Sequence, residues 1–403
     1  MSKRIWFLTQ FFDPEPTFKG AKFARAIIDA GFEVEVITGF PNYPGGKLYP
    51  GYKVKLLKKE ILNGVKVNRV ALYPSHDRNA IRRAFNYLSF CLSSFIFLWF
   101  RSKRNDMVYV YHPPITVGLA AALVRKLGGP RYIIDVQDLW PNTLASTGMV
   151  ENQLALKIIG ILSRFVYRNA HKVVAQSHGF KVELLKMGVE QRQLQTIYNW
   201  CDESYQVVSD TVTRLQLEWH GHFVMVYCGN LGLAQDLQNV LEAVALLRKR
   251  VVNFKFIVVG SGVEKEGLVK RADELGLDNV AFLGRKSRSE IPSILAAADY
   301  ALVSLKSDPL FEITLPSKMQ EYMFAGKPIV AVGGAELCKM VKVSGAGIAI
   351  GPGDPRGLCE ALTGLLQMDD RGLQRYSKAG CEYYEENFAF KVGVKKFCQL
   401  FDS

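Results

Sequence analysis

The sequence contains few of the residues from which metal sites and disulfide frameworks are built. Its 403 residues include seven cysteines and six histidines, with no Cys-x-x-Cys pair and no Cys/His spacing typical of a zinc site. An odd number of scattered cysteines argues against a disulfide framework and favours a reducing compartment. We therefore expect no structural zinc site, and as a separate prediction we expect no bound metal and no resident cofactor.

The sequence also lacks low-complexity segments, internal repeats and an apolar leader of signal-peptide length. The apolar run Ile5–Leu8 directly follows the basic pair Lys3–Arg4 and is typical of a first strand. The composition, 49% hydrophobic and 22% charged, is that of a globular protein. A chain of this length favours two domains of about 200 residues each. We expect the protein to stay in the cytoplasm.

Excess positive charge is confined to the first half of the chain. Residues 1–200 contain 28 Lys and Arg against 13 Asp and Glu, whereas residues 201–403 contain 23 against 25. A one-sided positive field attracts an anionic partner, such as nucleic acid, a phosphorylated substrate or an anionic membrane. No known RNA- or DNA-binding module and no array of basic and aromatic residues accompanies the charge. We therefore do not expect a nucleic-acid partner.

Short apolar runs alternate with helical stretches along the whole chain. Many runs are apolar throughout, as expected for strands of a parallel sheet that is covered on both faces. Helical stretches of ten or more residues separate most of them, which predicts doubly wound α/β units. The predicted strands are Arg4–Leu8, Val34–Thr38, Val67–Leu72, Met107–Tyr111, Tyr132–Val136, Lys172–Ala175, Thr196–Tyr198, Val224–Cys228, Lys255–Val259, Val280–Leu283, Tyr300–Ser304 and Ile329–Val332.

The polar stretch Asp202–His222 marks a seam between the two halves. We predict an α/β protein with a Rossmann-like domain over residues 1–202, a second over residues 203–386, and a terminal helix within residues 387–403 that crosses back to the first domain. Open parallel sheets bind ligands at the carboxyl ends of their strands, so two such domains are expected to face a central cleft.

Two loops of the second half are suited to a phosphorylated ligand. Tyr227–Gly232 runs from a strand into a glycine-rich turn before a helix, and its candidate residues are Gly229, Asn230 and Gly232. Glycines allow close backbone approach, and a helix N-terminus attracts an anion. Such turns are common, so a purely structural turn is an equally good interpretation. Arg285, after another strand, can stack on a base or bind a phosphate, whereas Lys286 beside it is more typical of a solvated loop.

The segment Leu315–Val330 carries the most specific pattern. Ser317 can cap a helix that ends at Gly326. Lys318 lies in the first helical turn, where a cation opposes the helix dipole, and this placement is reasonable if the lysine meets a diphosphate. Glu321 follows one turn later and can accept hydrogen bonds from two vicinal hydroxyls. The alternative is an exposed Lys–Glu pair worth about 0.2–0.5 kcal/mol.

The first half offers acidic residues and a histidine at predicted strand ends. Asp138 follows the strand Tyr132–Val136 and is a candidate to accept a proton from the acceptor hydroxyl or to orient the sugar. A helix N-cap or a loop-stabilising aspartate is an equally good interpretation. His112 is placed similarly, although a lone histidine is more often structural. Asp13 and Glu15 lie in the first strand-to-helix loop, where they can contact a substrate.

The segment Phe85–Phe100 contains 16 uncharged residues, seven of them aromatic. It is shorter than the about 20 residues needed to span a bilayer. Aromatic residues beside basic clusters favour a helix that packs inward with one face and touches lipid with the other. The alternative is a helix buried in the first domain. The expected membrane residues are Arg82, Arg83, Phe95, Trp99, Phe100, Arg101, Lys103 and Arg104.

Together these motifs resemble the family 4 retaining glycosyltransferases of the GT-B fold. The donor-site resemblance rests on Leu315–Val330 and the turn before it. The segments Pro41–Pro44, Tyr49–Tyr52, His112–Pro114, Val136–Pro141 and Asn199–Asp202 resemble the WbuB-like group. That group contains bacterial transferases of O-antigen and capsule assembly, including N-acetyl-L-fucosamine transferases. The resemblance covers nearly the whole chain.

The resemblance implies a UDP-sugar donor, a polyprenyl-diphosphate-linked sugar acceptor and a place on the cytoplasmic face of the inner membrane. It implies that Glu321 binds the donor ribose, that Lys318 faces the diphosphate and that Arg285 lies against the base or phosphates. We assign Asp13, Glu15, Asn42 and Tyr43 to the acceptor side, and Asp138 and His112 to catalysis. No Asp-x-Asp motif stands in a donor-like context, and such enzymes usually stabilise the leaving diphosphate with cationic side chains and helix dipoles.

The sequence departs from the family pattern at two places. Many members have a glutamate eight residues before the ribose-binding one, where this chain has Ile313 with Glu312 beside it. Many also have an arginine and a lysine after the glycine-rich turn, where this chain has Leu233–Gln235. Lys318 and Arg285 are therefore expected to carry more of the diphosphate charge. A sugar-nucleotide 2-epimerase of the same architecture is the alternative, but it does not need a lipid-facing helix.

Overall fold

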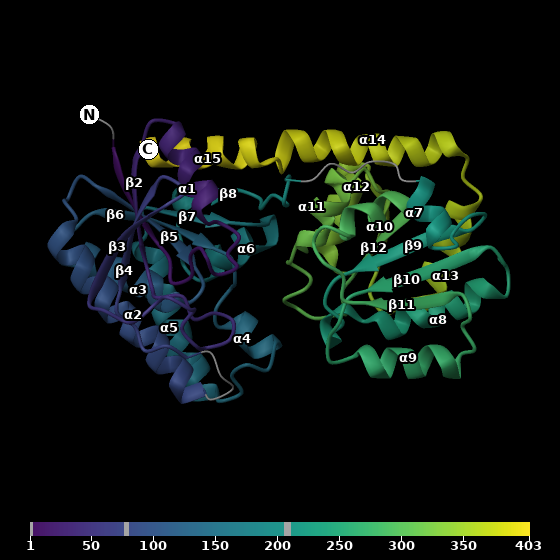
Figure 1. Cartoon of the computed structure of the whole chain (residues 1–403), viewed down its shortest axis with the longest axis horizontal. Coiled ribbons are helices and arrows are strands. Elements are labelled where there is room, and N and C mark those ends of the chain that lie inside the picture. The colour runs from purple at the N-terminus through teal and green to yellow at the C-terminus, as the bar shows by residue number, and fades with distance from the viewer. Residues whose placement is uncertain (1–2, 76–79, 205–210) are drawn as a thin grey trace. The chain divides into compact units, whose positions relative to one another are not determined.

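The chain folds into two compact α/β units (Figure 1). The computed structural model describes residues 3–75, 80–204 and 211–403. Unit 1 comprises Met1–Ile197 and Val394–Ser403, and unit 2 comprises Tyr198–Gly393. The chain thus passes between the units five residues before the predicted seam at residue 202, and again seven residues after residue 386.

Unit 1 is built on an eight-stranded sheet in the order β3-β4-β2-β1-β5-β6-β7-β8. All neighbours are parallel except β3 and β4, which form an antiparallel hairpin at the sheet edge. Asn63 and Gly64 both have positive φ in the hairpin turn, the conformation that matches strand twist. The strands are β1 Arg4–Leu8, β2 Glu33–Thr38, β3 Leu57–Leu62, β4 Val65–Val70, β5 Met107–His112, β6 Arg131–Val136, β7 Lys172–Ala175 and β8 Leu194–Thr196.

Helices cover the sheet of unit 1 and close its core. The last helix of the chain contributes Phe397 and Phe401, which pack on Tyr109 and other buried aromatic rings. The final ten residues therefore belong to the core of unit 1. The helices are α1 Ala21–Asp29, α2 Ala80–Arg101, α3 Ile115–Lys126, α4 Asn142–Ser146, α5 Gln153–Asn169, α6 His178–Lys186 and α15 Phe390–Asp402, with a 3₁₀ turn at Gln191–Gln193.

Unit 2 is built on a six-stranded parallel sheet in the order β11-β10-β9-β12-β13-β14. Side chains alternate along β9, so that Val226 enters the hydrophobic cluster on one face and Tyr227 the cluster on the other. The strands are β9 Phe223–Cys228, β10 Phe254–Val259, β11 Val280–Gly284, β12 Tyr300–Ser304, β13 Ile329–Val332 and β14 Gly347–Ile350. The helices are α7 Thr211–Gln216, α8 Leu237–Arg248, α9 Lys265–Glu274, α10 Ile291–Ala297, α11 Ser317–Phe324, α12 Ala335–Ser344, α13 Pro355–Leu366 and α14 Asp370–Asn387.

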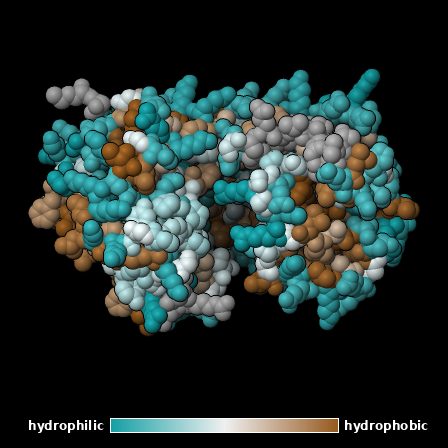
Figure 2. All heavy atoms as spheres, viewed as in Figure 1, coloured by the Kyte–Doolittle hydropathy of each residue, from teal (hydrophilic) through white to brown (hydrophobic). Residues whose placement is uncertain are grey.

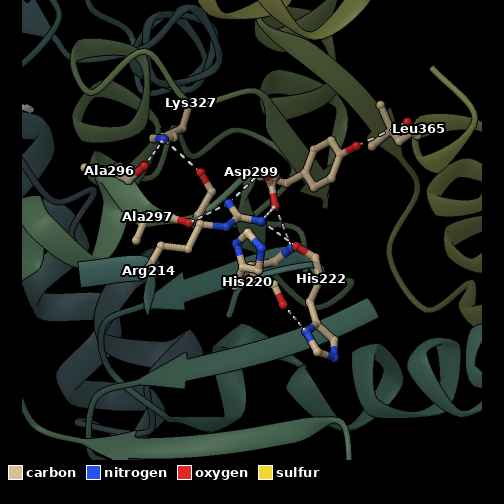
Figure 3. Close-up of polar contacts among 11 residues, drawn as sticks. Arg214, His220, His222, Ala296, Ala297, Asp299, Lys327 and Leu365 are labelled. Carbon is tan, nitrogen blue, oxygen red and sulfur yellow. Dashed lines mark hydrogen bonds and ion pairs between the residues drawn. The ribbon is translucent and has the colours of Figure 1, made fainter. Parts of the chain in front are cut away.

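A polar cluster fixes the amino-terminal ends of β9 and β12 in unit 2 (Figure 3). Arg214 of α7 binds both carboxylate oxygens of Asp299 at 3.0 Å, and Asp299 accepts the amide of Val224 at 2.8 Å. Lys327 donates to the carbonyls of Ala296 and Ala298 at 2.8 Å, where a cation complements the carboxyl end of α10. Lys327 therefore has a structural partner, although it belongs to the informative Leu315–Val330 segment.

Candidate functional site

Glycines bring the carboxyl ends of β9 and β10 into direct backbone contact. Gly229 and Gly260 both have φ of +146°, a conformation that favours glycine. A Cβ atom on Gly260 would lie 1.8 Å from the carbonyl oxygen of Gly229, and one on Gly262 would lie 2.1 Å from that of Leu231. The sequence analysis did not single out Gly260 and Gly262, although a Gly-x-Gly directly after a strand is a signal for such a turn.

Lys318 fills the space that the missing side chain of Gly229 leaves. A Cβ atom on Gly229 would lie 2.3 Å from Cε of Lys318. The ammonium group lies 3.8 Å from the ring centroid of Tyr227 and donates to the hydroxyl of that residue. Burial lowers the pKa of Lys318 to about 8, with Cys228 and Glu321 acting in the opposite direction. Lys318 is therefore a partly desolvated cation against the glycine-rich turn, where an anion would restore its full charge.

Glu321 lies one turn further along α11 and is partly exposed. Burial and the Glu321 charge together raise the pKa of the Cys228 thiol, at the end of β9, to about 12. Glu321 is thus within electrostatic reach of the same strand end as Lys318. The predicted cap at Ser317 is wrong, because the N-cap position is Pro316 and Ser317 is the first residue of α11.

A pocket of about 390 Å³ opens beside the glycine-rich turn. Gly229 and Asn230 line one side, and Arg285 lines another from the exposed loop after β11. Lys286 also lines the pocket and forms a 3.3 Å ion pair with Glu290. The pocket lies at the carboxyl ends of β9, β10 and β11, where parallel sheets bind ligands. Its full lining is Gly229, Asn230, Val259, Gly260, Ser261, Arg285, Lys286 and Ile291.

Two residues of unit 2 that the sequence analysis considered, Gly232 and Glu312, form hydrogen bonds within the unit. Gly232 is not part of the pocket lining, and its amide donates to the side-chain oxygen of Gln235 at 3.0 Å. Glu312 accepts the amide of Ala335 at 2.7 Å, at the N-terminus of α12. Glu312, one residue away from the family's glutamate position, therefore lies at a helix N-terminus, where a carboxylate is stabilising.

Three of the four predicted acceptor-side residues form one bonded cluster in unit 1. Glu15 is buried and accepts the amides of Phe12, Asn42 and Tyr43 at 3.2, 2.7 and 2.8 Å. Burial raises the pKa of Glu15 even though these three amides favour its charged form. Through these three hydrogen bonds the Glu15 carboxylate joins the loop that contains Phe12 to the loop that contains Asn42 and Tyr43. The direct substrate contact predicted for Glu15 is therefore wrong, because its side chain faces these amides rather than solvent.

The other acceptor-side residues differ in their exposure. Asn42 is also buried and donates to the carbonyl of Phe40 at 2.9 Å. Tyr43 is partly exposed, with its ring 4.8 Å from that of Phe11. Asp13 accepts the amide of Ala21 at 2.7 Å and so fixes the start of α1.

Asp138 lies in the loop after β6 and is largely buried. Burial raises the pKa of its carboxyl group, as suits a group that exchanges a proton. The loop begins beside a buried ion pair in which Lys19 Nζ lies 2.5 Å from Asp135 Oδ2. Gln137 donates to the second oxygen of Asp135 at 2.7 Å, which anchors the turn that carries Asp138. The sequence analysis missed Asp135 because it lies within a strand.

His112 is completely buried, contrary to the catalytic role predicted for it. Its ring packs edge-on against Trp140 and Tyr167, with centroid distances of 5.8 and 6.3 Å. Burial lowers the pKa of His112 to about 3, so the imidazole is neutral at physiological pH. A neutral ring without solvent access packs the loop around Trp140 rather than exchanging protons with a substrate.

The predicted membrane helix is longer than its apolar run. α2 has 22 residues, and Ile81–Arg101 is long and apolar enough by composition to cross a membrane, with 33% of its most apolar window buried. Trp99 and Phe100 are 43% and 78% exposed, whereas Phe95 is partly buried. The basic residues do not form one cluster. Arg82 and Arg83 lie at one end of α2, and Arg101, Lys103 and Arg104 lie about 30 Å away at the other.

Residues 21–200 match the family model described as "Glycosyl transferase 4-like domain", and residues 213–382 match "Glycosyl transferases group 1". Solved glycosyltransferases share the two-unit fold. Sucrose-phosphate synthase of Thermosynechococcus elongatus aligns with a TM-score of 0.73 at 17% identity, over 99% of this chain and 98% of its own. HepE of Anabaena, in complex with UDP and glucose, aligns with a TM-score of 0.69 at 16% identity over the whole of both chains. The chain is a GT-B glycosyltransferase.

Some curated relatives of this transferase are named for colanic acid or lipopolysaccharide core biosynthesis. It is 27% identical over 303 residues to the probable glycosyltransferase WbjE of Pseudomonas aeruginosa, covering 74% of each chain. It is 28% identical over 305 residues to the putative colanic acid biosynthesis glycosyl transferase WcaI of Escherichia coli K12, covering 73% of this chain and 74% of the relative. The model for the 4-like domain lies in unit 1, and the group 1 model lies in unit 2.

Proposed function

We propose that this protein is a retaining glycosyltransferase that moves a sugar from a UDP-sugar to a polyprenyl-diphosphate-linked sugar. The observation that carries the proposal is the placement of Lys318 against the Gly229 turn, with Glu321 one turn further along α11. A partly desolvated ammonium at a glycine-rich strand end suits a diphosphate, and a nearby carboxylate suits the two hydroxyls of a ribose. The solved complexes of HepE with UDP and with UDP-glucose support this class of donor.

The donor site would act by stabilising the leaving group. When the bond between the anomeric carbon and the diphosphate oxygen breaks, negative charge develops on the diphosphate, and Lys318 and Arg285 would compensate it. The acceptor hydroxyl oxygen forms the new bond on the same face of the sugar. Its proton passes to Asp138 or to the departing diphosphate, and UDP is released. This reaction needs no metal ion. Among the described residues, no three His, Cys, Asp or Glu side chains form a group that could hold one.

The biological setting follows from the relatives and from the WbuB-like motifs. Curated relatives are named for colanic acid and lipopolysaccharide core biosynthesis. We propose N-acetyl-L-fucosamine as the transferred sugar and O-antigen or capsule assembly as the process. The motifs in Pro41–Pro44 and Val136–Pro141 support this subgroup.

We also propose that α2 holds the protein on the cytoplasmic face of the inner membrane. α2 lies along the domain surface rather than crossing a bilayer, because one of its faces belongs to the fold. Asn86 of this helix is completely buried, accepts from Gln10 at 2.5 Å and donates to the carbonyl of Tyr73 at 2.7 Å. A helix bound to two loops in this way cannot leave the domain without breaking both contacts.

The test is acceptor-dependent transfer with a panel of donors. Purified protein is incubated with UDP- and GDP-sugars, including UDP-N-acetyl-L-fucosamine, and a short polyprenyl-diphosphate-GlcNAc, with and without EDTA. We expect UDP release and a mass gain of one sugar, undiminished by EDTA. NMR of the product should show the same anomeric configuration as in the UDP-sugar donor. Isomerisation of a sugar nucleotide without acceptor would favour the 2-epimerase, and inversion or EDTA-sensitive transfer would overturn the proposed mechanism.

A further inference from the structure

The helices α2, α3 and α5 together contain no acidic residue. Their sequences are AIRRAFNYLSFCLSSFIFLWFR, ITVGLAAALVRK and QLALKIIGILSRFVYRN. They contain eight basic residues, namely Arg82, Arg83, Arg101, Arg125, Lys126, Lys157, Arg164 and Arg168. Part of the positive charge of the first half is thus concentrated in these three helices, which contribute no carboxylate of their own.

α5 presents an apolar stripe to solvent that the sequence analysis did not identify. Leu154, Ile158 and Ile161 are 66%, 51% and 52% exposed, and their spacing of four and three residues places them on one face of the helix. Lys157 and Arg164 are exposed on the same side. α5 therefore combines an exposed apolar stripe with basic residues, the pattern of helices that lie in a lipid interface.

α2 presents a longer stripe of the same kind. Phe85, Leu88, Leu92, Ile96 and Trp99 are between 43% and 61% exposed and are spaced three or four residues apart. The opposite face of α2 carries the buried residues Asn86, Phe90, Ser94 and Leu98. Much of this stripe is exposed to solvent, although Phe85 also packs edge-on against Tyr73 of the same unit, with ring centroids 6.5 Å apart.

The two helices that carry the stripes belong to one helix layer of unit 1. α3 contacts both α2 and α5, and all three helices lie together in unit 1 (Figure 1). Hydrophobic residues are exposed along the left flank of unit 1 in Figure 2, where Figure 1 places α2. With helix axes about 8–10 Å apart and a length of about 30 Å, the surface is large enough to rest on a bilayer. We call α2, α3 and α5 the basic helix layer.

We propose that α5 is a second lipid-binding helix, and that the basic helix layer docks unit 1 onto an anionic membrane through the α2 and α5 stripes together. Charge decides between lipid and a second copy of this chain. In a symmetric dimer the layer would meet itself and bring its basic residues together, whereas anionic headgroups attract them.

Both helices are connected to loops at the end of the sheet that carries the acceptor-side candidates. Asn86 of α2 donates to the side-chain oxygen of Asn42 at 3.5 Å, and α5 follows α4, the short helix that comes after the loop carrying Asp138. Docking through both helices would therefore hold this end of the sheet near the lipid surface. Only this last point rests on the proposed transfer to a lipid-linked acceptor, since lipid binding itself requires no catalytic activity.

The test measures binding of the purified full-length chain to vesicles without substrates. Vesicles of phosphatidylethanolamine with 30% phosphatidylglycerol are compared with pure phosphatidylcholine in a flotation assay. The double variant Leu154→Glu/Ile158→Glu should lower the partition coefficient on anionic vesicles at least tenfold. Lys157→Ala/Arg164→Ala should lower it about 30-fold at low salt, because each basic residue near the surface contributes about fivefold. Val343→Glu, at a 62% exposed helix position of unit 2, is the matched control and should bind like the original protein.

The outcomes separate this proposal from its alternatives. If the α5 variants float like the original protein while Phe85→Glu/Leu92→Glu does not, α5 is not part of the surface and the proposal is wrong. If light scattering finds a dimer that the α5 variants dissociate, and vesicle binding is unchanged, the layer is a protein interface instead. Circular dichroism and the thermal midpoint of each variant show whether unit 1 is folded, and UDP binding, measured calorimetrically, shows whether the donor site of unit 2 is intact. Loss of lipid binding with an intact fold and normal UDP binding supports the docking surface whatever sugar is transferred.

Discussion

The candidate residues of unit 2 and those of unit 1 differ in what their side chains already bind. In unit 2, Arg285 is exposed on the pocket, and Lys318 lies beside the glycine-rich turn with its ammonium group on Tyr227. In unit 1, Glu15 accepts hydrogen bonds from three backbone amides, and His112 is buried against the aromatic rings of Trp140 and Tyr167. A charged group that the fold leaves accessible can serve a ligand, whereas one that the fold has satisfied serves the loop around it. The predictions below test this difference.

The largest effect is expected from Lys318→Met. Removing one preorganised donor from a developing negative charge lowers activity by about 10²–10³-fold. We expect this loss in kcat/KM for the UDP-sugar, with an unchanged thermal midpoint because the methionine stem can still cover the Gly229 turn. Lys270→Met, at an 80% exposed side chain on α9, is the matched control and should retain full activity.

Gly260→Ala should lower the stability of unit 2, because the new methyl group would clash with the backbone of the Gly229 turn. The new methyl group would lie 1.8 Å from the carbonyl oxygen of Gly229 at a φ of +146°. We expect a loss of about 1–3 kcal/mol in the free energy of unfolding, measured by urea titration, together with weaker UDP binding. Gly267→Ala on α9, where no atom lies within 4 Å of the new methyl group, should be neutral or stabilising. Equal stability of the two variants would contradict the contact between the two strand ends.

Raising the pH should weaken UDP-sugar binding through Lys318 but increase the contribution of Lys318 to folding stability. Its pKa in the folded protein is about 8, below the ordinary lysine value of 10.5. UDP-sugar binding needs the ammonium form, so kcat/KM should fall as pH rises above about 8, and Lys318→Arg should abolish that fall. Between pH 8 and 10.5 the unfolded chain binds more protons than the folded one at this site. The Lys318 contribution to folding stability should therefore rise with pH, as the difference between the original protein and Lys318→Met would reveal.

The smallest effect is expected from His112→Phe. The buried ring donates to no described partner, and both of its nitrogens are without one in the structure. A phenyl ring of similar volume should change stability by less than about 1.5 kcal/mol and kcat by no more than a few fold. Asp138→Asn is the comparison, and it should lower kcat without a comparable loss of stability. A large fall in kcat for a stable His112→Phe would restore a catalytic role for the histidine.

The sequence predicted the fold well wherever strands are apolar throughout. It missed β3, whose LKKEIL alternates between exposed and partly buried residues at the sheet edge, and β14, which is only partly buried. It placed β8 two residues late, at Thr196–Tyr198 rather than Leu194–Thr196. Alternating or short edge strands lack the continuous apolar signal on which the prediction depends.

The candidate site could be predicted only in part, because local pattern does not report burial. Lys318 stood out because a lysine in a first helical turn is locally unfavourable. Glu15 and His112 occupy the same kind of strand-end position as true ligand residues, and only tertiary packing distinguishes them. Asp135 was missed because it lies within an apolar strand. The exposed stripe on α5 was missed because its three apolar residues do not form a continuous apolar run.

A crystal structure of the protein soaked with UDP tests the central claim most directly. The account predicts the diphosphate within hydrogen-bond distance of Lys318 Nζ and the Gly229 turn, the ribose hydroxyls on Glu321, and the base in the pocket lined by Arg285 and Ile291. Unit 2 also has a hollow of about 470 Å³ lined by Glu242, Lys249, Asp354 and Arg356. UDP bound there, or bound with its diphosphate away from Lys318, would contradict the assignment of the donor site.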